Sequence, residues 1–159
     1  MHLEFIKLTQ VNPSDIVELN NHPAVLRQMP LGSPDFTIEK SQSWAKEKDA
    51  QWDIYGYGPW AFRVDGVFAG WGGLQKEDDD ADLALVLHPN YWGMGKTIYQ
   101  EIIRRAFNEM HLESITILLP LSRKIIKVLL RYGFRPDGSV SFDGIEFQRF
   151  RLFANNAKL

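Results

Sequence analysis

The feature that most constrains this chain is a short loop containing two glycines, which joins an apolar segment directly to a helix. Residues 82–87 (DLALVL) predict a buried strand, and residues 96–110 repeat apolar side chains at helical spacing with charged residues outside that stripe. Between these segments, Gly93 and Gly95 leave the backbone free in φ and open to close approach. A strand that runs through such a loop into a helix is typical of α/β folds.

The rest of the chain alternates between strand and helix patterns. Asp65-Gly66 is a strong hairpin signal, and Asp143-Gly144 separates two closing strands. A helix is expected from Asn12, which is placed to cap it. Further strands are expected at 3–8, 60–64, 67–74, 114–119, around Ser139 and at 145–153, and further helices at 37–50 and 123–132. The 159 residues show no linker or repeat, so we expect an α/β (α+β) fold in a single domain, residues 1–159.

Composition narrows the classes of partner. The net charge of −2 gives no general attraction to nucleic acid or to anionic lipid, and no apolar stretch approaches the roughly 20 residues of a membrane span. The chain has no cysteine, and its four histidines show no ligand spacing, so no metal site is expected. We therefore expect a cytoplasmic protein, monomeric or homodimeric, that binds neither nucleic acid nor membrane.

The loop before the 96–110 helix is suited to an anion. The first N–H groups of a helix lack partners within the helix, and its dipole adds partial positive charge there. Gly95-Lys96-Thr97 matches the end of a phosphate-binding loop of nucleotide triphosphatases, but that motif needs a glycine where this chain has Asn90. The strand at 115–119 also lacks a terminal Asp to hold magnesium, which disfavours this alternative.

A second interpretation fits the loop better. Residues 88–95 (HPNYWGMG) resemble the pyrophosphate loop of the GNAT N-acetyltransferase superfamily, closest to the RimJ/RimL (ribosomal-protein N-acetyltransferase) type, with Asn90 in place of the usual Gln or Arg. Residues 65–74 resemble that family's second hairpin, and residues 129–134 resemble the end of its cofactor-side helix. The resemblance implies a three-layer α/β/α fold. Its central sheet would be mixed, mostly antiparallel and splayed at the cofactor strand 82–87.

The resemblance also implies acetyl-CoA as donor and direct transfer of its acetyl group to a primary amine, either a protein N-terminus or a small molecule. The backbone of Leu85 and Leu87 would pair with the pantetheine arm, and an N–H near Val86 would polarise the thioester carbonyl. The N–H groups of residues 92–96 would bind the pyrophosphate. The expected cofactor-binding residues are Leu85, Val86, Leu87, Asn90, Trp92, Gly93, Met94, Gly95, Lys96, Thr97 and Ser122.

The expected catalytic residues are Asp82, Tyr132 and Ser122. Asp82 stands where relatives often carry a glutamate, and it is preferred as general base over His88, with bulk solvent as the alternative. Tyr132 is the candidate to protonate the thiolate. Ser122 stands where many relatives carry an Asn that touches pantetheine, and it could still donate a hydrogen bond there or instead cap the 123–132 helix. At three positions where relatives carry proton-transfer groups, this chain has apolar residues, namely Ile117, Ile125 and Leu129. They leave open a second function, a catalytically weak acyl-CoA sensor.

Overall fold

Seven strands form one mixed sheet in the computed structural model, which describes residues 1–123 and 125–158. The strand order is β1-β2-β3-β4-β5-β7-β6, and all neighbours are antiparallel except the parallel pair β4 and β5. The expected mixed, mostly antiparallel sheet is thus confirmed. The strands are β1 (Leu3–Ile6), β2 (Pro59–Val64), β3 (Val67–Glu77), β4 (Asp80–Leu87), β5 (Ser114–Pro120), β6 (Arg135–Phe142) and β7 (Ile145–Phe153).

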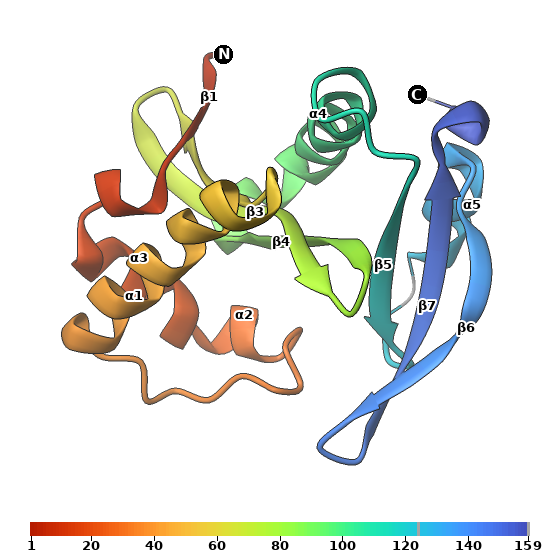
Figure 1. Ribbon diagram of the computed structural model, residues 1–159. Coiled ribbons are helices and arrows are strands. Elements are labelled where there is room, and N and C mark those ends of the chain that lie inside the picture. The colour runs from red at the N-terminus through yellow and green to blue at the C-terminus, as the bar shows by residue number, and fades with distance from the viewer. Residues whose placement is uncertain (124, 159) are drawn as a thin grey trace.

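Helices cover both faces of the sheet, which confirms the three-layer architecture (Figure 1). One face packs against α1 (Pro13–Asn21), α2 (Pro23–Leu26) and α3 (Ile38–Tyr55), and the other against α4 (Gly95–Asn108) and α5 (Ile126–Tyr132). Short 3-10 helices are η1 (Leu8–Gln10), η2 (Pro89–Met94) and η3 (Ala154–Asn156). Each face has its own apolar core. The core of the α4–α5 side contains the fully buried Ile98 and Ile102, and that of the α1–α3 side contains Ile16 and Leu19.

Three helices differ from their predicted extents. The short helix α2 was not expected: His22 caps it by accepting a hydrogen bond from the Ala24 N–H, and Pro23 occupies its first position. Helix α3 continues past residue 50 and ends at Gly56, whose φ of 78° favours glycine. Helix α5 begins at Ile126 rather than at residue 123, because the chain first completes a turn after β5.

Close packing of β3 on β4 fixes the position of β4. A Cβ at Gly70 would lie 2.2 Å from the Val86 carbonyl oxygen, and one at Gly72 would lie 2.4 Å from that of Ala84. Both glycines are therefore required by the close approach of the two strands. The β3–β4 turn lies at Asp78, whose φ is 51°, within the acidic run of residues 77–80.

The sheet opens between β4 and β5. Their register pair is Asp82 with Thr116, near the start of both strands, and beyond it the two strands separate (Figure 1). We call this opening the fork. Its closed end is fastened by Arg151 of β7, which contacts both Asp80 carboxylate oxygens at 2.9 and 3.0 Å and Asp137 at 2.9 Å. The expected splay at the cofactor strand is confirmed, and the open end of the fork lies at Leu85–Leu87.

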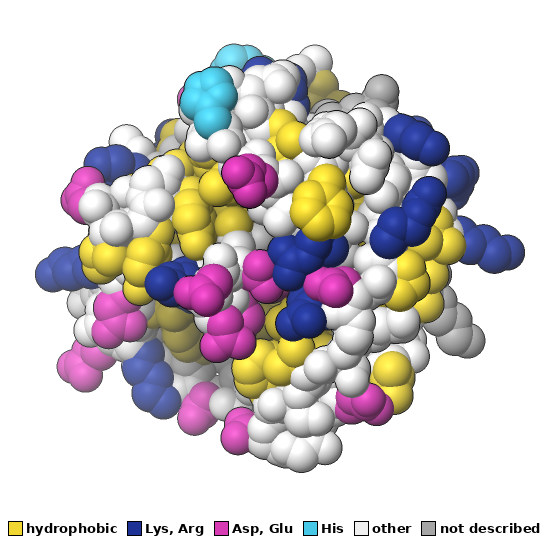
Figure 2. Space-filling model, turned by 45° about the vertical axis from the view of Figure 1, so that its right-hand side comes forward, with side chains coloured by type: hydrophobic (Ala, Val, Ile, Leu, Met, Phe, Trp, Pro, Cys, Tyr) yellow, Lys and Arg dark blue, Asp and Glu magenta, His cyan; other side chains and the backbone are white. Residues whose placement is uncertain are grey.

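Charged side chains are mixed on the face turned to the viewer in Figure 2. Lys and Arg alternate with Asp and Glu across its centre, while basic side chains gather toward the upper right. Positive and negative side chains are thus interspersed over this surface, in keeping with the near-neutral net charge of the whole chain.

Candidate active site

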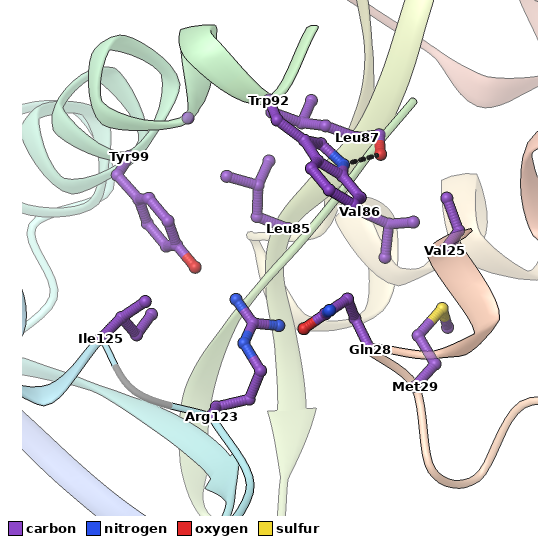
Figure 3. Close-up of a pocket in the computed structure, with 11 residues that line it drawn as sticks. Val25, Gln28, Met29, Leu85, Val86, Leu87, Trp92, Tyr99, Arg123 and Ile125 are labelled. Carbon is purple, nitrogen blue, oxygen red and sulfur yellow. Dashed lines mark hydrogen bonds between the residues drawn. The ribbon is translucent and has the colours of Figure 1, made fainter. Parts of the chain in front are cut away.

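A cavity of about 430 Å³ lies at the open end of the fork, and we call it the fork cavity (Figure 3). Residues of α2, β4, η2, α4 and the segment before α5 surround it, so chain segments far apart in sequence meet there. Its lining consists of Val25, Gln28, Met29, Leu85, Val86, Leu87, Trp92, Gly95, Tyr99, Arg123 and Ile125.

A second cavity of about 470 Å³ lies between α4 and α5, and we call it the α4–α5 cavity. It shares Gly95, Tyr99 and Ile125 with the fork cavity, so the two adjoin. Lys96, Arg131 and Lys158 add basic groups to its lining. Together the two cavities form a long groove, apolar at β4 and basic toward α5.

The backbone of β4 presents alternate residues to the groove. The His88 N–H bonds to the Ala69 carbonyl of β3, and the strand register then turns the polar backbone groups of Val86 toward Trp71 of the same strand. Those of Leu85 and Leu87 consequently face the fork, beyond the last pairing with β5. This agrees with the expected role of Leu85 and Leu87. The Val86 N–H itself is directed to β3, so the N–H near Val86 that was expected to face the thioester would be that of Leu85 or Leu87.

Trp92 changes the role expected for Leu87. Its indole Nε1 donates a 2.8 Å hydrogen bond to the Leu87 carbonyl oxygen, and the side chain is 49% exposed beside the fork cavity (Figure 3). An extended ligand that pairs with β4 therefore meets the N–H of Leu87 but finds its carbonyl already engaged. The sequence placed Trp92 in the loop without predicting this contact.

The glycine loop is more ordered than its sequence suggests. It forms the 3-10 helix η2, in which His88 accepts hydrogen bonds from the N–H groups of Asn90 and Tyr91, and the Gly95 N–H bonds to Trp92. Of the N–H groups of residues 92–96 that were expected to bind the pyrophosphate, that of Gly95 is therefore already engaged. Gly95 has φ −53°, which any residue adopts, so glycine is not needed here for backbone conformation.

The presence of glycine at positions 93 and 95 is explained by the open space beside them rather than by their φ angles. A Cβ built on Gly93 or Gly95 meets no atom within 4 Å, and Gly95 lines both cavities. Met94, the residue before α4, makes no side-chain capping hydrogen bond, and a helix start without such a cap is suited to an anion. Gly93, Met94, Gly95 and Lys96 thus lie where a phosphate would meet the first turn of α4.

Two expected cofactor residues face other parts of the surface. Asn90 lines a separate hollow with Asp15, Glu18 and His88 on the α1 side. The Thr97 side chain lines a hollow with Phe5 on the β1 side of α4. The side chains of both residues therefore lie outside the groove, because η2 and α4 rotate them away from it.

Asp82 lies at the closed end of the fork. Its Oδ1 accepts a 2.8 Å hydrogen bond from the Thr116 hydroxyl, and burial raises the pKa of this carboxyl to about 7 despite that bond. Its side chain borders a hollow beside α3, on the face opposite α4 and α5. The alternative base, His88, pairs with Glu18 at 3.5 Å and so is directed toward α1.

Tyr132, the candidate acid, borders the groove, whereas Ser122 does not. This residue is 6% exposed and lines the α4–α5 cavity, and its hydroxyl is buried without a hydrogen-bond partner among the described residues. Ser122 lies exposed in the turn after β5, outside the lining of both cavities. It does not cap α5 either, because Ile125 occupies that position.

Three polar residues of the fork cavity were not singled out from the sequence. Tyr99 falls in the apolar stripe of α4 and was read as core, Arg123 was read as the start of a helix, and Gln28 lies near the end of the unpredicted helix α2. A hydroxyl within an apolar stripe was the available signal for Tyr99. Arg123 and Gln28 gave none, because only the tertiary structure brings them together.

Within residues 1–123 and 125–158, no group of three or more His, Cys, Asp or Glu side chains is arranged to hold a metal ion. Over the same residues, no helix is both long and apolar enough to cross a membrane.

Comparison with known proteins agrees with this geometry. No curated protein matches the chain in sequence. Solved structures similar in fold include a GNAT-family acetyltransferase from Bacillus anthracis (15% identity, 96% of this chain and 95% of that one, TM-score 0.75). Another is spermidine N-acetyltransferase from Vibrio cholerae in complex with CoA and spermine (12%, 97% and 96%, 0.76). A third is yncA from Salmonella typhimurium with acetyl-CoA (17%, 96% and 92%, 0.68). The acetyltransferase (GNAT) domain family matches residues 4–135, and the chain therefore belongs to this family of enzymes, whose acetyl donor is acetyl-CoA.

Proposed function

We propose that this protein transfers the acetyl group of acetyl-CoA directly to a primary amine. The observation that carries the proposal is one continuous groove, in which the unpaired backbone edge of Leu85 adjoins the open first turn of α4 at Gly95. The acceptor is a small-molecule amine or a protein N-terminus, the latter in keeping with the resemblance to the RimJ/RimL type. Direct transfer needs no enzyme nucleophile, and the described residues that line the groove include neither Cys nor Ser.

In this proposal, the chain binds the donor along the length of the groove. The backbone groups of Leu85 and the Leu87 N–H pair with the extended pantetheine arm, as a further strand would. The pyrophosphate meets the start of α4 at Gly93–Lys96, and the Lys96, Arg131 and Lys158 side chains supply positive charge at the α4–α5 end. The N–H groups of Leu85 and Leu87 are the donors nearest to the thioester carbonyl.

Asp82 serves as the general base. An ammonium acceptor must lose a proton before it attacks, and a carboxylate with a pKa of about 7 is half ionised near neutral pH. Asp82 lies three residues from Leu85, about 10 Å along the strand, so it reaches the amine through water. Its position on the α1–α3 side places it opposite the donor.

Tyr132 protonates the CoA thiolate as it leaves. Burial raises the pKa of Tyr132, which keeps the phenol protonated at neutral pH and able to donate. Its unpartnered hydroxyl borders the cavity that Gly95 and Tyr99 also line. A buried hydroxyl without a partner is costly, so a ligand that accepts its hydrogen bond would be stabilised.

Release of free thiol from acetyl-CoA tests the function. The purified protein is incubated with acetyl-CoA and a panel of amines, namely amino acids, polyamines and N-terminal peptides, and thiol release is followed. Calorimetry in parallel should show acetyl-CoA binding that does not need magnesium, and no comparable binding of ATP. Magnesium-dependent binding of ATP alone would overturn the proposal.

A second function, acyl-CoA sensing, rests on the apolar residues Ile117, Ile125 and Leu129. Leu129 and Ile117 are buried, at 1% and 2% exposure, so neither position supplies a proton-transfer group. A sensor would bind acetyl-CoA in the calorimeter yet release no thiol with any amine of the panel. The same two measurements therefore separate enzyme from sensor.

A further inference from the structure

Arg123 is the cation of the fork cavity. Its guanidinium points from the end of the β5 turn into the space beside Leu85 (Figure 3). The described lining of this cavity contains no Asp or Glu, and none of the ion pairs found among the described residues involves Arg123. The positive charge is thus not balanced by a carboxylate within the cavity.

Two neutral hydrogen-bonding groups face the same space. The Gln28 amide extends from the segment after α2 and the Tyr99 hydroxyl from α4, and both are directed toward the Arg123 guanidinium (Figure 3). Burial raises the pKa of Tyr99 although the Arg123 charge opposes this, so its phenol keeps its proton at neutral pH. Three donors from three separate elements therefore converge beside the strand edge where the thioester would lie.

This arrangement suits an anion and disfavours a second cation. A guanidinium offers two parallel N–H groups to a planar carboxylate, and the Gln28 amide and Tyr99 hydroxyl can donate to its remaining lone pairs. A polyamine would place a further ammonium group beside Arg123 without any carboxylate to balance it. We propose that the acceptor is a small amine that also carries a carboxylate, of the α-amino acid class, and that Arg123 binds this carboxylate. The inference rests on the proposed acetyltransferase function and names its acceptor.

The acidic side chains of the molecule do not offset this preference. Glu47, Glu77, Asp78 and Asp82 border the hollow beside α3, together with two lysines. That hollow shares no lining residue with the fork cavity. The ammonium and carboxylate groups of an α-amino acid are attached to the same carbon. A carboxylate held at Arg123 therefore keeps the amine beside Leu85, and Asp82 exchanges a proton with it through water.

The test uses pairs of acceptors that differ only in the carboxylate. The common amino acids are assayed for thiol release beside their C-terminal amides, and the ratio of kcat/KM for acid over amide is measured for the best pair. Arg123→Gln should reduce this ratio by roughly 10- to 100-fold, whereas Arg123→Lys should retain part of it because the charge remains but the planar fork is lost. Arg123→Glu should reverse the preference, so that diamines such as 1,4-diaminobutane become the better acceptors. Reactivity differences between the two amines cancel when the ratio is compared between variants.

Arg63→Gln is the matched control, because this substitution removes the same charge from β2, which lies two strands away from β4. It should leave the ratio unchanged. Calorimetric titration of the preferred amino acid into protein saturated with CoA gives a readout independent of turnover, and Arg123→Gln should abolish that heat.

Several outcomes would overturn the inference while leaving the proposed function standing. These are equal use of acid and amide, a preference for polyamines or peptides, or a change in Arg123→Gln confined to the KM for acetyl-CoA. Absence of thiol release with every amine, despite binding of acetyl-CoA, would instead refute the proposed function.

Discussion

The Asp82 carboxylate and the Thr116 hydroxyl meet at 2.8 Å at the register pair where β4 and β5 join. Beyond this pair the two strands part, so the hydrogen bond stands at the closed end of the fork. The same bond favours the ionised carboxylate, whereas burial opposes it, and the resulting pKa is about 7. The geometry of the fork and the proton affinity of the proposed base are therefore linked through one residue pair.

Replacement of Asp82 by Asn should lower kcat/KM by roughly 10²–10⁴, because the variant has lost the proposed base. A base acts only when it is deprotonated, so the activity of the unmodified protein should rise as pH increases through about 7. In Asp82→Asn that rise should disappear, while acetyl-CoA affinity, measured by calorimetry, stays nearly unchanged. A variant that keeps the original pH–rate profile would exclude Asp82 as the base.

Thr116→Val should move the pH profile without removing the base. Valine has nearly the same shape as threonine but no hydroxyl, so the ionised form of Asp82 loses a hydrogen bond and its pKa rises above about 7. The ascending limb of the pH–rate profile should shift to higher pH, with the plateau largely preserved. Thr116→Ser, which retains the hydroxyl, is the control. A shift to lower pH in the valine variant would show that this bond does not stabilise the charge.

Asp82 also makes stability depend on pH. Its pKa is raised from 3.8 in an unfolded reference to about 7, so the folded protein holds this proton more tightly. The contribution of Asp82 to the free energy of unfolding should therefore fall as pH rises from about 4 to beyond 7. Asp82→Asn should remove this contribution, so it should be no less stable than the parent at pH 8. Chemical denaturation at pH 5 and pH 8 measures the difference, and an Asp82→Asn variant that weakens more at pH 8 than at pH 5 would contradict it.

Gly95→Val should abolish acetyl-CoA binding and leave the fold intact. The new side chain would project into the groove, where a Cβ at Gly95 meets no protein atom within 4 Å and the backbone needs no positive φ. Gly72→Ala is the contrasting variant, because its Cβ would lie 2.4 Å from the Ala84 carbonyl oxygen and should lower the Tm. Calorimetry and thermal melting of both variants separate lost binding from lost stability. Normal binding by a normally folded Gly95→Val protein would place the phosphates elsewhere.

Tyr132→Phe should reduce turnover without reducing stability. The hydroxyl it removes is buried and has no partner in the described part of the chain, and leaving such a group unsatisfied costs about 1–3 kcal/mol. The Tm should therefore stay level or rise, while kcat falls because the thiolate loses its proton donor. An unchanged kcat in this variant would show that Tyr132 contributes only to packing. A marked fall in Tm would show that its hydroxyl makes a hydrogen bond in solution.

Local patterns predicted most of the fold. The turn at Asp65-Gly66 needs only two adjacent residues with positive φ, and both have it. The α4 stripe likewise follows from spacing alone, and its buried members are Ile98, Ile102, Ile103 and Ala106. The loop between β4 and α4 was located correctly for the same reason.

The details of the site depend on tertiary structure and escaped the sequence. The direction of the Val86 N–H is set by the register with β3, which no local pattern specifies. The engagement of the Leu87 carbonyl by Trp92 depends on how η2 folds back over β4. Arg123 and Gln28 are 95 positions apart in sequence, so only the folded chain places them in one cavity.

The parting of β4 from β5 has a consequence for solubility. It places unpaired strand edges within the sheet, and such edges can template pairing with another chain. An extended ligand bound along Leu85 and Leu87 would block such pairing, and the Trp92 indole already covers the Leu87 carbonyl at the fork. We therefore expect the supply of CoA thioesters to govern how readily this protein self-associates, with light scattering on heating decreasing as CoA is added.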